Sequence, residues 1–215
     1  MDKEDLAGRR IVVTAGGTQE PIDPVRHIGN RSSGKMGYAI AEAARDRGAI
    51  VTLITAPTAL HEPAGMTVIH IRTVAELREA VFKAVKGADA LVMAAAVSDF
   101  RVADPSTHKI KKQGGKLLLE LVENEDFLPL LADDFVKVGF AAESDDLLAN
   151  AKRKLAQKRL DLIVANDITA ADSGFDVDTN RVTFIDKDNA IEELPLLSKR
   201  EVAERILDRI AQVMK

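Results

Sequence analysis

Short apolar runs alternate with helical segments along most of this 215-residue chain, and this alternation limits the folds open to it. The expected strands are Arg10–Ala15, Ile50–Thr55, Val68–Ile71, Ala90–Ala95, Val136–Phe140 and Leu162–Ala165. The expected helices are Lys35–Arg47, Val74–Lys86, Asp145–Lys158 and Lys199–Met214. Strands that alternate with helices in this way form a parallel sheet with helices on both faces. The sequence therefore predicts an α/β fold with a doubly wound, mostly parallel, Rossmann-like sheet.

Two parts of the chain break the alternation and predict antiparallel hairpins. Lys109–Val122 consists of two extended segments around Gly114-Gly115, which is a favourable hairpin turn. Arg181–Ile185 and Ala190–Leu196 flank a second turn at residues 187–189. Antiparallel insertions in a parallel fold often serve as a lid or a dimer contact, and we expect one of these roles here.

The composition suits one packed domain. Hydrophobic residues make up 46% of the chain, and the net charge of −4 does not favour nucleic acid. The absence of cysteine excludes disulfides, cysteine nucleophiles and thiolate metal sites. No signal peptide or long apolar run is visible, so we expect a cytoplasmic protein without membrane contact. Residues 1–8 are polar and predict a flexible tail or linker remnant, with 9–215 as a single domain.

Thr14–Gly37 has the strongest chemical signal, because it joins the first expected strand to the first expected helix. Gly16 and Gly17 permit a tight turn and a close approach of the backbone to a ligand. Ser32-Ser33-Gly34 precedes the helix, whose first N–H groups and positive dipole end attract anions. The side chains that could add hydrogen bonds or positive charge are Thr18, Arg26, Asn30, Ser32, Ser33 and Lys35. The segment therefore predicts an anion site, with phosphate as the favoured ligand.

The two common phosphate motifs fit this segment incompletely. Gly29–Lys35 matches G-x-x-x-x-G-K, but Met36 stands where a P-loop has Ser or Thr. The dinucleotide fingerprint G-x-G-x-x-G is absent, and Val51–Thr55 does not end in the acid that would bind a ribose. Two interpretations of this segment remain open. It could form a nucleotide or phosphate site of another kind, or an ordinary glycine-rich surface loop before a capped helix.

Ligands of open α/β sheets bind beyond the carboxyl ends of the strands. After the fourth strand, three alanines would let a flat ligand lie against the backbone, and Asp99 could accept from its amino or hydroxyl group. Asp99 could equally be a cap or turn residue. Lys109 and Lys111 share a face of an extended segment, and Lys154 and Lys158 share a helix face. Both pairs could neutralise a polyphosphate or simply face solvent.

Several motifs occur together in a characteristic order. They are AGGTQEPIDPVRHIGNRSSGKMG, AAAVSDFRV, KIKK, VENEDF, GFAAES, a Lys-x-x-x-Lys helix and DLIVANDIT. From about Leu6 onward the chain closely resembles the bacterial phosphopantothenoylcysteine synthetases, or CTP-dependent phosphopantothenate–cysteine ligases. In many bacteria such a ligase is the carboxy-terminal half of the bifunctional coenzyme A biosynthesis flavoprotein.

The resemblance implies a two-step reaction. CTP, accompanied by Mg²⁺, activates the carboxylate of 4′-phosphopantothenate as an acyl-cytidylate and releases pyrophosphate. The amine of cysteine then attacks, giving 4′-phosphopantothenoylcysteine and CMP. The resemblance also implies a homodimer and a possible covalent link to a phosphopantothenoylcysteine decarboxylase half. That half is not part of this chain, so we expect no flavin here.

Roles for individual residues follow from the resemblance by position in the motifs. Asn30 would stabilise the acyl-cytidylate and its turnover, since an amide can donate to a developing oxyanion without titrating. Arg26 would bind the 4′-phosphate, and Gly16, Gly17 and Thr18 would contact the same substrate. The expected CTP contacts are Ser32, Ser33, Gly34, Lys35, Met93, Ala94, Ala95, Asp99, Lys109, Asn124, Glu125, Asp126, Phe127, Phe140, Lys154 and Lys158.

The chain departs from the family pattern in one region. Asn124-Glu125-Asp126-Phe127 replaces the common Asn-Pro-Asp-Ile, and the stretch Leu128–Val138 is shorter than usual. Two alternatives also stay open. An NAD(P)-dependent reductase would need Tyr-x-x-x-Lys, whereas Tyr38 is followed by Glu42. A non-catalytic nucleotide-binding module would keep the anion loop without needing both Asn30 and Arg26.

Overall fold

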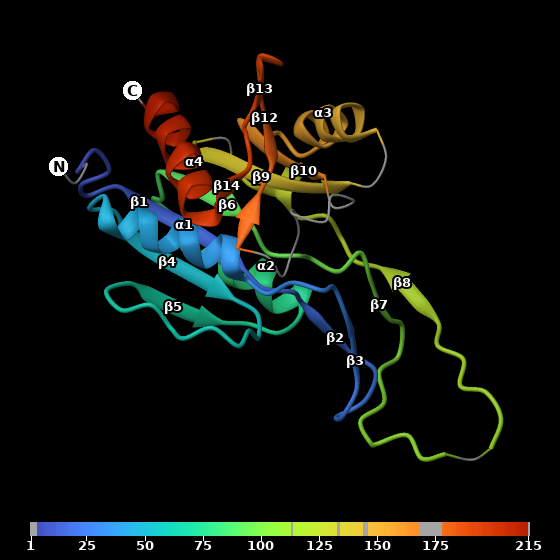
Figure 1. The fold of residues 1–215 in the computed structure, drawn as a ribbon. Helices are drawn as coiled ribbons and strands as arrows, with labels where there is room; N and C mark the ends of the chain where they lie inside the picture. The colour runs from blue at the N-terminus through green and yellow to red at the C-terminus, as the bar shows by residue number, and fades with distance from the viewer. Residues whose placement is uncertain (1–3, 113, 133, 144–145, 168–177, 215) are drawn as a thin grey trace.

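The computed structural model describes residues 4–112, 114–132, 134–143, 146–167 and 178–214. Its centre is an eight-stranded sheet with the order β13–β12–β10–β9–β6–β1–β4–β5 (Figure 1). The strands are β1 (Arg10–Ala15), β4 (Ile50–Thr55), β5 (Thr67–His70), β6 (Ala90–Met93), β9 (Val136–Glu143), β10 (Leu162–Asp167), β12 (Val182–Asp186) and β13 (Ile191–Glu193). The pairs from β5 to β10 are parallel, and β12 and β13 add an antiparallel edge. The predicted doubly wound, mostly parallel sheet is confirmed.

The strand order reverses direction between β1 and β6. The chain first builds outward from β1 to β4 and β5, and then returns to place β6 on the other side of β1. The loops that leave β1 and β6 therefore run side by side, and a bridge between Gly17 and Ala96 extends the parallel pairing beyond the strands. Such a reversal is where open α/β sheets bind their ligands.

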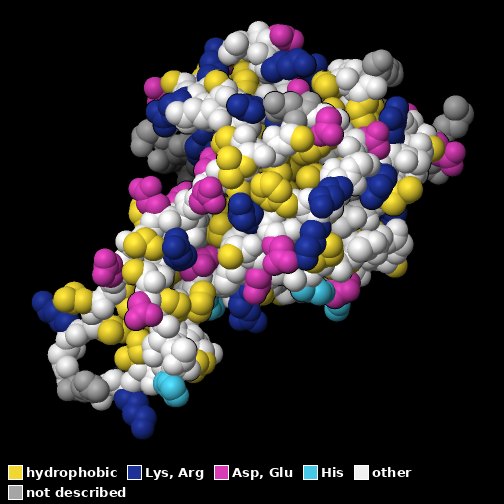
Figure 2. All heavy atoms as spheres, turned by 180° about the vertical axis from the view of Figure 1, so that it is seen from behind, with side chains coloured by type: hydrophobic (Ala, Val, Ile, Leu, Met, Phe, Trp, Pro, Cys, Tyr) yellow, Lys and Arg dark blue, Asp and Glu magenta, His cyan; other side chains and the backbone are white. Residues whose placement is uncertain are grey.

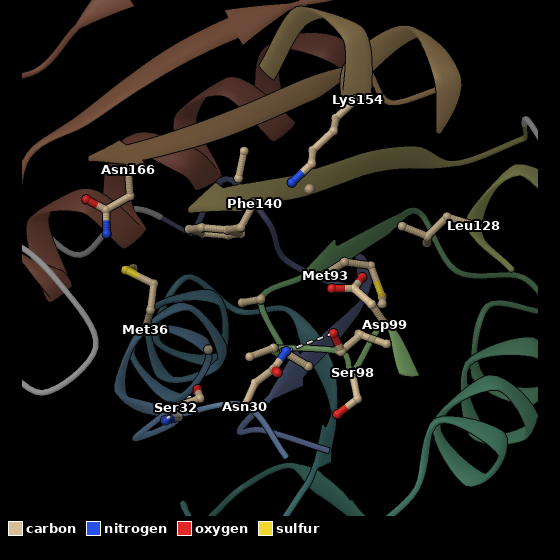
Figure 3. Close-up of a pocket in the computed structure, with 18 of the residues that line it drawn as sticks. Asn30, Ser32, Met36, Met93, Ser98, Asp99, Leu128, Phe140, Lys154 and Asn166 are labelled. Atoms are coloured by element: carbon tan, nitrogen blue, oxygen red, sulfur yellow. Dashed lines mark hydrogen bonds between the residues drawn. The ribbon is translucent and has the colours of Figure 1, made fainter. Parts of the chain in front are cut away.

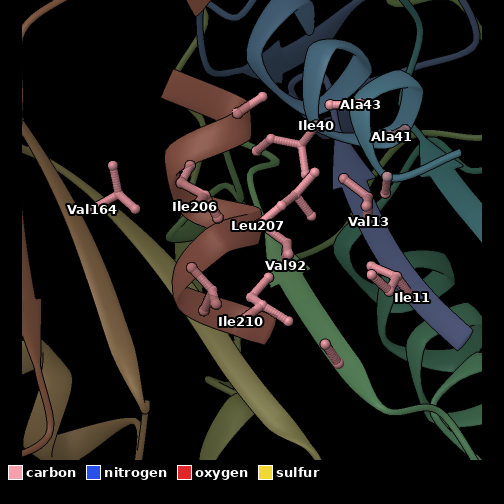
Figure 4. Packing of buried hydrophobic residues seen from close by; sticks show 14 of the residues in the cluster. Ile11, Val13, Ile40, Ala41, Ala43, Val92, Val164, Ile206, Leu207 and Ile210 are labelled. Atoms are coloured by element: carbon pink, nitrogen blue, oxygen red, sulfur yellow. The ribbon is translucent and has the colours of Figure 1, made fainter. Parts of the chain in front are cut away.

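Helices cover both faces of the sheet because side chains of each strand alternate between the faces. Ile11 and Val13 pack with α1 (Lys35–Asp46) and α4 (Lys199–Val213), as Figure 4 shows. On the opposite face, Val12 packs with α2 (Val74–Ala84), and β10 packs with α3 (Leu147–Gln157). None of the helices in the described ranges is long and apolar enough to span a membrane.

The helix N-termini differ in a way that matters for the site. α2 and α4 begin with capping boxes, Thr73 with Glu76 and Ser198 with Glu201, whose side chains satisfy the first N–H groups. α1 begins instead after Gly34, which has a φ of 77° and provides no side-chain cap. The start of α1 is thus the N-terminus best suited to a ligand among these three.

One predicted hairpin is confirmed and the other is wrong in its position. β12 and β13 pair as expected, with Ile185 opposite Ile191. The pairing expected within 109–122 instead lies at the base of that segment, between β7 (Phe100–Val102) and β8 (Leu121–Glu123). Residues 103–112 and 114–120, here called the arm, form no strand. An isolated two-stranded ribbon needs a further layer over its apolar side chains, and no described part of the chain forms one here.

The arm and the hairpin of β2 (Gln19–Pro21) and β3 (His27–Gly29) project from the same end of the sheet (Figure 1). Figure 2 shows hydrophobic side chains gathered along this projection. Leu117, Leu118 and Leu121 are exposed there, and Leu118 keeps 88% of its surface open. The projection is therefore a large apolar surface outside the main core.

The first described residues differ from the expected flexible tail. Leu6 is completely buried in the main core, and its N–H donates to the carbonyl of Arg47. The carboxylate of Asp5 forms an ion pair with the buried guanidinium of Arg47 at 2.6 Å. Residues 5–8 thus pack as part of the domain, since a buried leucine and a paired arginine hold them.

Candidate active site

A pocket of about 630 Å³ lies beside the carboxyl ends of β6, β9 and β10, a volume typical of small-molecule sites. Figure 3 shows its lining. The predicted site residues in the lining are Asn30, Ser32, Ser33, Gly34, Lys35, Met93, Ala94, Ala95, Asp99, Asn124, Glu125, Asp126, Phe127, Phe140, Lys154 and Lys158. Most of the predicted CTP contacts therefore surround one cavity, although they come from five separate parts of the chain.

Asn30 follows β3 and lies at the floor of the pocket in Figure 3. Its Nδ2 donates to the carbonyl oxygen of Val97 at 2.9 Å. That carbonyl can only accept, so it fixes which end of the amide faces the loop after β6. An amide nitrogen carries two hydrogens, and the second is available to a ligand oxygen in the pocket.

Gly16, Gly17 and Thr18 do not line the pocket, and their expected contact with substrate stays a prediction. Gly16 has a φ of 80°, which explains the glycine there. A Cβ on Gly17 would lie 2.4 Å from the carbonyl oxygen of Asn30, so this glycine makes room for the protein's own backbone. Thr18 is fully buried, and its hydroxyl bonds to Ser98. These residues shape the site from beneath.

Arg26 and Lys109 also lie outside the pocket lining of this chain. The Arg26 guanidinium donates through Nε and Nη2 to Oδ2 of buried Asp23, at 3.0 and 2.5 Å. Its Nη2 also donates to the carbonyl of Ile110 in the arm at 2.8 Å. Arg26 thus connects the β2–β3 hairpin to the residue next to Lys109, and the predicted phosphate contact is not part of this cavity.

The start of α1 forms one end of the pocket. A Cβ on Gly34 would lie 2.7 Å from Cγ2 of Thr58, which excludes larger residues at this turn. Lys35 lines the cavity and pairs with exposed Asp178 at 2.7 Å. The Lys35 hydrogen bond and charge, with a smaller contribution from Lys199, hold the pKa of Asp178 below its usual value. This end of the pocket therefore combines a helix N-terminus that has no side-chain cap with a lysine already paired to a carboxylate.

The wall after β6 is built partly by backbone groups. The Ala95 N–H donates to Oγ1 of Thr14 at 3.1 Å, and the Ala96 N–H donates to the Gly16 carbonyl. These two N–H groups are therefore already used by the protein. Asn124 fastens the same loop from the other side, since its Nδ2 donates to the Ser98 carbonyl at 3.0 Å and its N–H to the Asp99 carbonyl.

The opposite wall is formed by β9 and α3. Phe140 and Lys154 reach toward the cavity in Figure 3. Lys158 pairs with Asp126 at 3.1 Å, which joins α3 to the segment that departs from the family pattern. The ring of Phe127 is only 2% exposed and packs against Phe82, so this side chain belongs mainly to the core. A cationic helix face thus closes the pocket opposite Asn30.

Five further polar residues line the pocket that the motifs did not indicate as ligands: Arg31, Ser98, Asn166, Asn180 and Lys199. Asn166 lies in the motif DLIVANDIT, but no contact was predicted for it. Asn166 donates to Oδ1 of Asn180 at 3.3 Å, and Asn180 donates to the Met36 sulfur. Asn180 and Lys199 lie in no recognisable motif. Asn180 belongs to β11 (Thr179–Asn180), which pairs with β14 (Leu197–Ser198) in a separate two-stranded sheet, and Lys199 is the first residue of α4.

The reductase alternative gains nothing from the structure. Tyr38 is 6% exposed and lies outside the pocket lining. Its hydroxyl lies 3.3 Å from Oγ1 of Thr55 and accepts from Thr58. The tyrosine therefore packs between α1 and β4 rather than facing a ligand.

Comparison with known proteins identifies the fold. The DNA/pantothenate metabolism flavoprotein C-terminal domain family matches residues 6–214. The coenzyme A biosynthesis bifunctional protein CoaBC of Bacillus subtilis (strain 168) is 46% identical over 214 residues, covering 98% of this chain and 53% of that protein. The crystal structure of the C-terminal domain of a CoaBC protein has a TM-score of 0.84 at 39% identity, covering 99% of this chain and 98% of that one.

A more distant solved structure, Cab2 mutant H337A in complex with phosphopantothenate-cysteine, has a TM-score of 0.76 at 19% identity, covering 95% of this chain and 87% of that one. This similarity supports the shared fold. The chain spans about half the length of the Bacillus relative. The resemblance inferred from the sequence motifs is confirmed. The chain belongs to the DNA/pantothenate metabolism flavoprotein C-terminal domain family.

Proposed function

We propose that this chain is a phosphopantothenate–cysteine ligase of coenzyme A biosynthesis. The observation that carries the proposal is the Asn30 amide, held by the Val97 carbonyl at the floor of a ligand-sized pocket. The carbonyl oxygen of an activated acyl group becomes negative as an amine attacks. A fixed neutral donor stabilises that charge without needing to change protonation. The CoaBC name of the Bacillus relative supports the same pathway.

The proposed reaction has two steps in this pocket. A carboxylate oxygen of 4′-phosphopantothenate attacks the α-phosphorus of CTP, and pyrophosphate leaves. The neutral amine of cysteine then attacks the acyl carbon, CMP leaves, and the amine loses a proton. Asn30 would donate to the acyl oxygen in the second step. The Cab2 complex contains phosphopantothenate-cysteine, the product of this chemistry, on the same fold.

The pocket supports a nucleotide at two places. The start of α1, which has no side-chain cap, suits phosphate groups together with Lys35, because the first N–H groups and the positive dipole end of a helix attract anions. The wall of Met93, Ala94 and Ala95 is small enough for a flat base to lie against it. Lys154 and Lys158 add positive charge across the cavity, and charge clusters of this kind attract polyphosphates.

Magnesium enters this proposal with the triphosphate. Mg²⁺ in nucleotide sites is held mainly by phosphates and water with one or two carboxylates. Asp99, Glu125 and Asp126 line the pocket and could supply such a carboxylate. Within the described ranges, no group of three or more acidic or histidine side chains could hold a metal ion. We therefore assign no protein ligand set to the metal.

The test mixes the protein with 4′-phosphopantothenate, cysteine, Mg²⁺ and each nucleoside triphosphate in turn, and follows pyrophosphate release. We expect release that requires phosphopantothenate, together with 4′-phosphopantothenoylcysteine in the mass spectrum. NADPH oxidation with the same substrates would favour the reductase alternative. Nucleotide binding without any turnover would favour a non-catalytic module.

A further inference from the structure

The loops that leave β1 and β6 are joined by a set of short hydrogen bonds. The Ala96 N–H donates to the Gly16 carbonyl at 2.8 Å, and the Thr18 N–H donates to the Ala96 carbonyl at 3.1 Å. The Ser98 N–H then donates to Oγ1 of Thr18 at 2.9 Å. These bonds continue the parallel pairing of the two strands into the loops, beyond the carboxyl ends of the sheet.

A buried hydroxyl pair completes this connection. Thr18 is fully buried and Ser98 is 4% exposed. Thr18 Oγ1 and Ser98 Oγ lie 3.1 Å apart, and Ser98 Oγ also approaches the Thr18 carbonyl at 3.4 Å. Buried hydroxyl groups destabilise a fold unless they have partners, so these two side chains hold one another in place. Neither hydroxyl has a place in the proposed reaction.

The residue between the fastened positions is Val97. Ala96 and Ser98 on either side are both bonded to the loop after β1, so the direction of the Val97 carbonyl is set by that loop. Asn124 adds a bond to the next carbonyl, that of Ser98. The Val97 carbonyl is the acceptor that orients the Asn30 amide. A chain of contacts therefore runs from Thr18 through Ser98 and Val97 to Asn30.

The backbone of Asn30 rests on the same loop. The space above Gly17 is filled by the Asn30 carbonyl, which a Cβ there would approach to 2.4 Å. The side chain and the backbone of Asn30 are thus both placed by residues 16–18, directly or through Ser98. This arrangement explains the glycine and the threonine of the motif without any contact to substrate.

We propose that Thr18 and Ser98 are positioning residues for the reaction, which orient the Asn30 amide through the Val97 carbonyl. The inference rests on the proposed function, because it assigns the pair to the step that uses Asn30. Without the pair, the Val97 carbonyl is no longer fixed and the amide donates less well to the acyl oxygen. Small misplacements of a positioned group cost on the order of 10²-fold in rate.

Thr18→Val removes the hydroxyl and keeps the shape, whereas Thr18→Ser restores the hydroxyl. Thr55→Val is the matched control, since Thr55 is also a buried threonine at a strand end and its hydroxyl donates to Ala56. Two rates are measured separately: pyrophosphate release with CTP and phosphopantothenate, and cysteine transfer from preformed acyl-cytidylate. Thermal unfolding of each variant is recorded.

We expect Thr18→Val to slow cysteine transfer about 10- to 100-fold while pyrophosphate release in a single turnover stays within about threefold of wild type. Thr18→Ser should recover most of the transfer rate, and Thr55→Val should keep both rates. Unchanged transfer in Thr18→Val would overturn the inference. Equal loss of both rates, or a loss that Thr18→Ser does not repair, would also overturn it.

A second readout does not depend on activity. The side-chain NH₂ signal of Asn30 is assigned by its absence in Asn30→Ala, and its chemical shift is compared among variants by NMR. We expect Thr18→Val to shift or broaden this signal and Thr55→Val to leave it unchanged. A wild-type protein without ligase activity would refute the proposed function alone. An Asn30 signal unaffected by Thr18→Val would refute the positioning role.

Discussion

The carboxylate of Asp23 accepts two hydrogen bonds from the guanidinium of Arg26, and both side chains bond to the backbone of one residue of the arm, Ile110. Oδ2 of Asp23 accepts from the Ile110 N–H at 3.1 Å, while Nη2 of Arg26 donates to the Ile110 carbonyl at 2.8 Å. Oδ1 of Asp23 also accepts from the Val25 and Arg26 N–H groups. The hairpin that carries the predicted phosphate contact is therefore tied to the arm that carries Lys109.

Asp23→Asn should loosen the arm, because a neutral amide cannot bind the guanidinium and the Ile110 N–H as a carboxylate does. We expect trypsin to cleave the arm, which contains Lys109, Lys111 and Lys112, several times faster than in the wild type. Asp104→Asn, an exposed acid of the arm, is the control and should not change the rate. Equal cleavage rates for the wild type and both variants would show that the contact of Asp23 and Arg26 with Ile110 does not anchor the arm.

The same contact gives a prediction about pH. The pKa of Asp23 lies far below the ordinary aspartate value of about 3.9. The main cause is the hydrogen bonding from the Arg26 side chain; desolvation opposes it in part, and backbone N–H groups add to it. A carboxylate whose pKa is lower in the folded than in the unfolded protein stabilises the fold at every pH above its unfolded pKa. That stabilisation is lost only as the pH falls through its pKa in the folded protein. We expect the wild-type arm to be cleaved more slowly than the arm of Asp23→Asn, and by the same factor, with pepsin at pH 4 and with trypsin at pH 7. Selective loosening of the wild-type arm between pH 6 and pH 4 would contradict this.

Asn30→Asp should separate the two proposed steps. A carboxylate would repel the developing oxyanion, and it would also face the Val97 carbonyl that now accepts from the amide at 2.9 Å. Losing one such donor costs about 10²–10³ in rate. We expect pyrophosphate release in the first turnover, slow transfer to cysteine, and an accumulated acyl-cytidylate in the mass spectrum. Wild-type product formation, or failure to bind CTP, would show another role for Asn30.

The preferred nucleotide should be CTP. The wall of Met93–Ala95 and the carboxylate of Asp99 can accept from an exocyclic amino group, and under the proposed function the cavity of about 630 Å³ would also hold 4′-phosphopantothenate. A pyrimidine leaves more of that volume free than a purine. We expect kcat/KM for pyrophosphate release to be at least tenfold higher with CTP than with ATP. Equal values for the two nucleotides would refute this preference.

The sequence predicted the fold because its signals are local: apolar runs, helical spacing and the glycines at turns. It also predicted much of the pocket, because Asn30 to Lys35 form one continuous segment. The pairing of Thr18 with Ser98 could not be predicted, since they lie 80 residues apart and meet only through the β1–β6 neighbourhood. Lys199 and Asn180 reach the pocket from the start of α4 and from the small β11–β14 sheet, which no local pattern places beside α1.

In the arm, the sequence predicted a strand pairing that the described residues of the structure do not form. Gly114 and Gly115 have φ values of 81° and 84°, as the expected turn requires, yet the strands beside them do not form. Pairing within a ribbon needs cover for its apolar side chains, and the described part of this chain provides none above Leu117 and Leu118. Local turn chemistry therefore predicted the bend but not the pairing.

Gly17→Ala should disturb both stability and the site. The added methyl group would lie 2.4 Å from the Asn30 carbonyl oxygen, and neither backbone can move freely between β1 and β3. Overpacking of this kind costs about 1–3 kcal/mol, which lowers Tm by about 2–4 °C for each kcal/mol. Gly8→Ala, where φ is 74° and the methyl group meets nothing within 4 Å, measures the cost of backbone strain without a steric clash, and its activity should stay at the wild-type level. A Gly17→Ala protein with wild-type Tm and cysteine transfer would refute this account of the motif.

The arm should be the contact of a homodimer. Leu118 and Leu121 are exposed on a projection that no other described residue covers, and contiguous apolar surface of this kind marks an interface. A second copy is the occupant we propose, because the arm carries Lys109 away from the pocket of its own chain and so toward a neighbour. We expect the wild type to be a dimer by light scattering at micromolar concentration, and Leu118→Lys to shift it to monomer with reduced ligase activity. Val213→Lys, at an exposed position of α4, should remain dimeric. A wild-type monomer with full activity would refute the dimer, because the arm would then have no partner to serve.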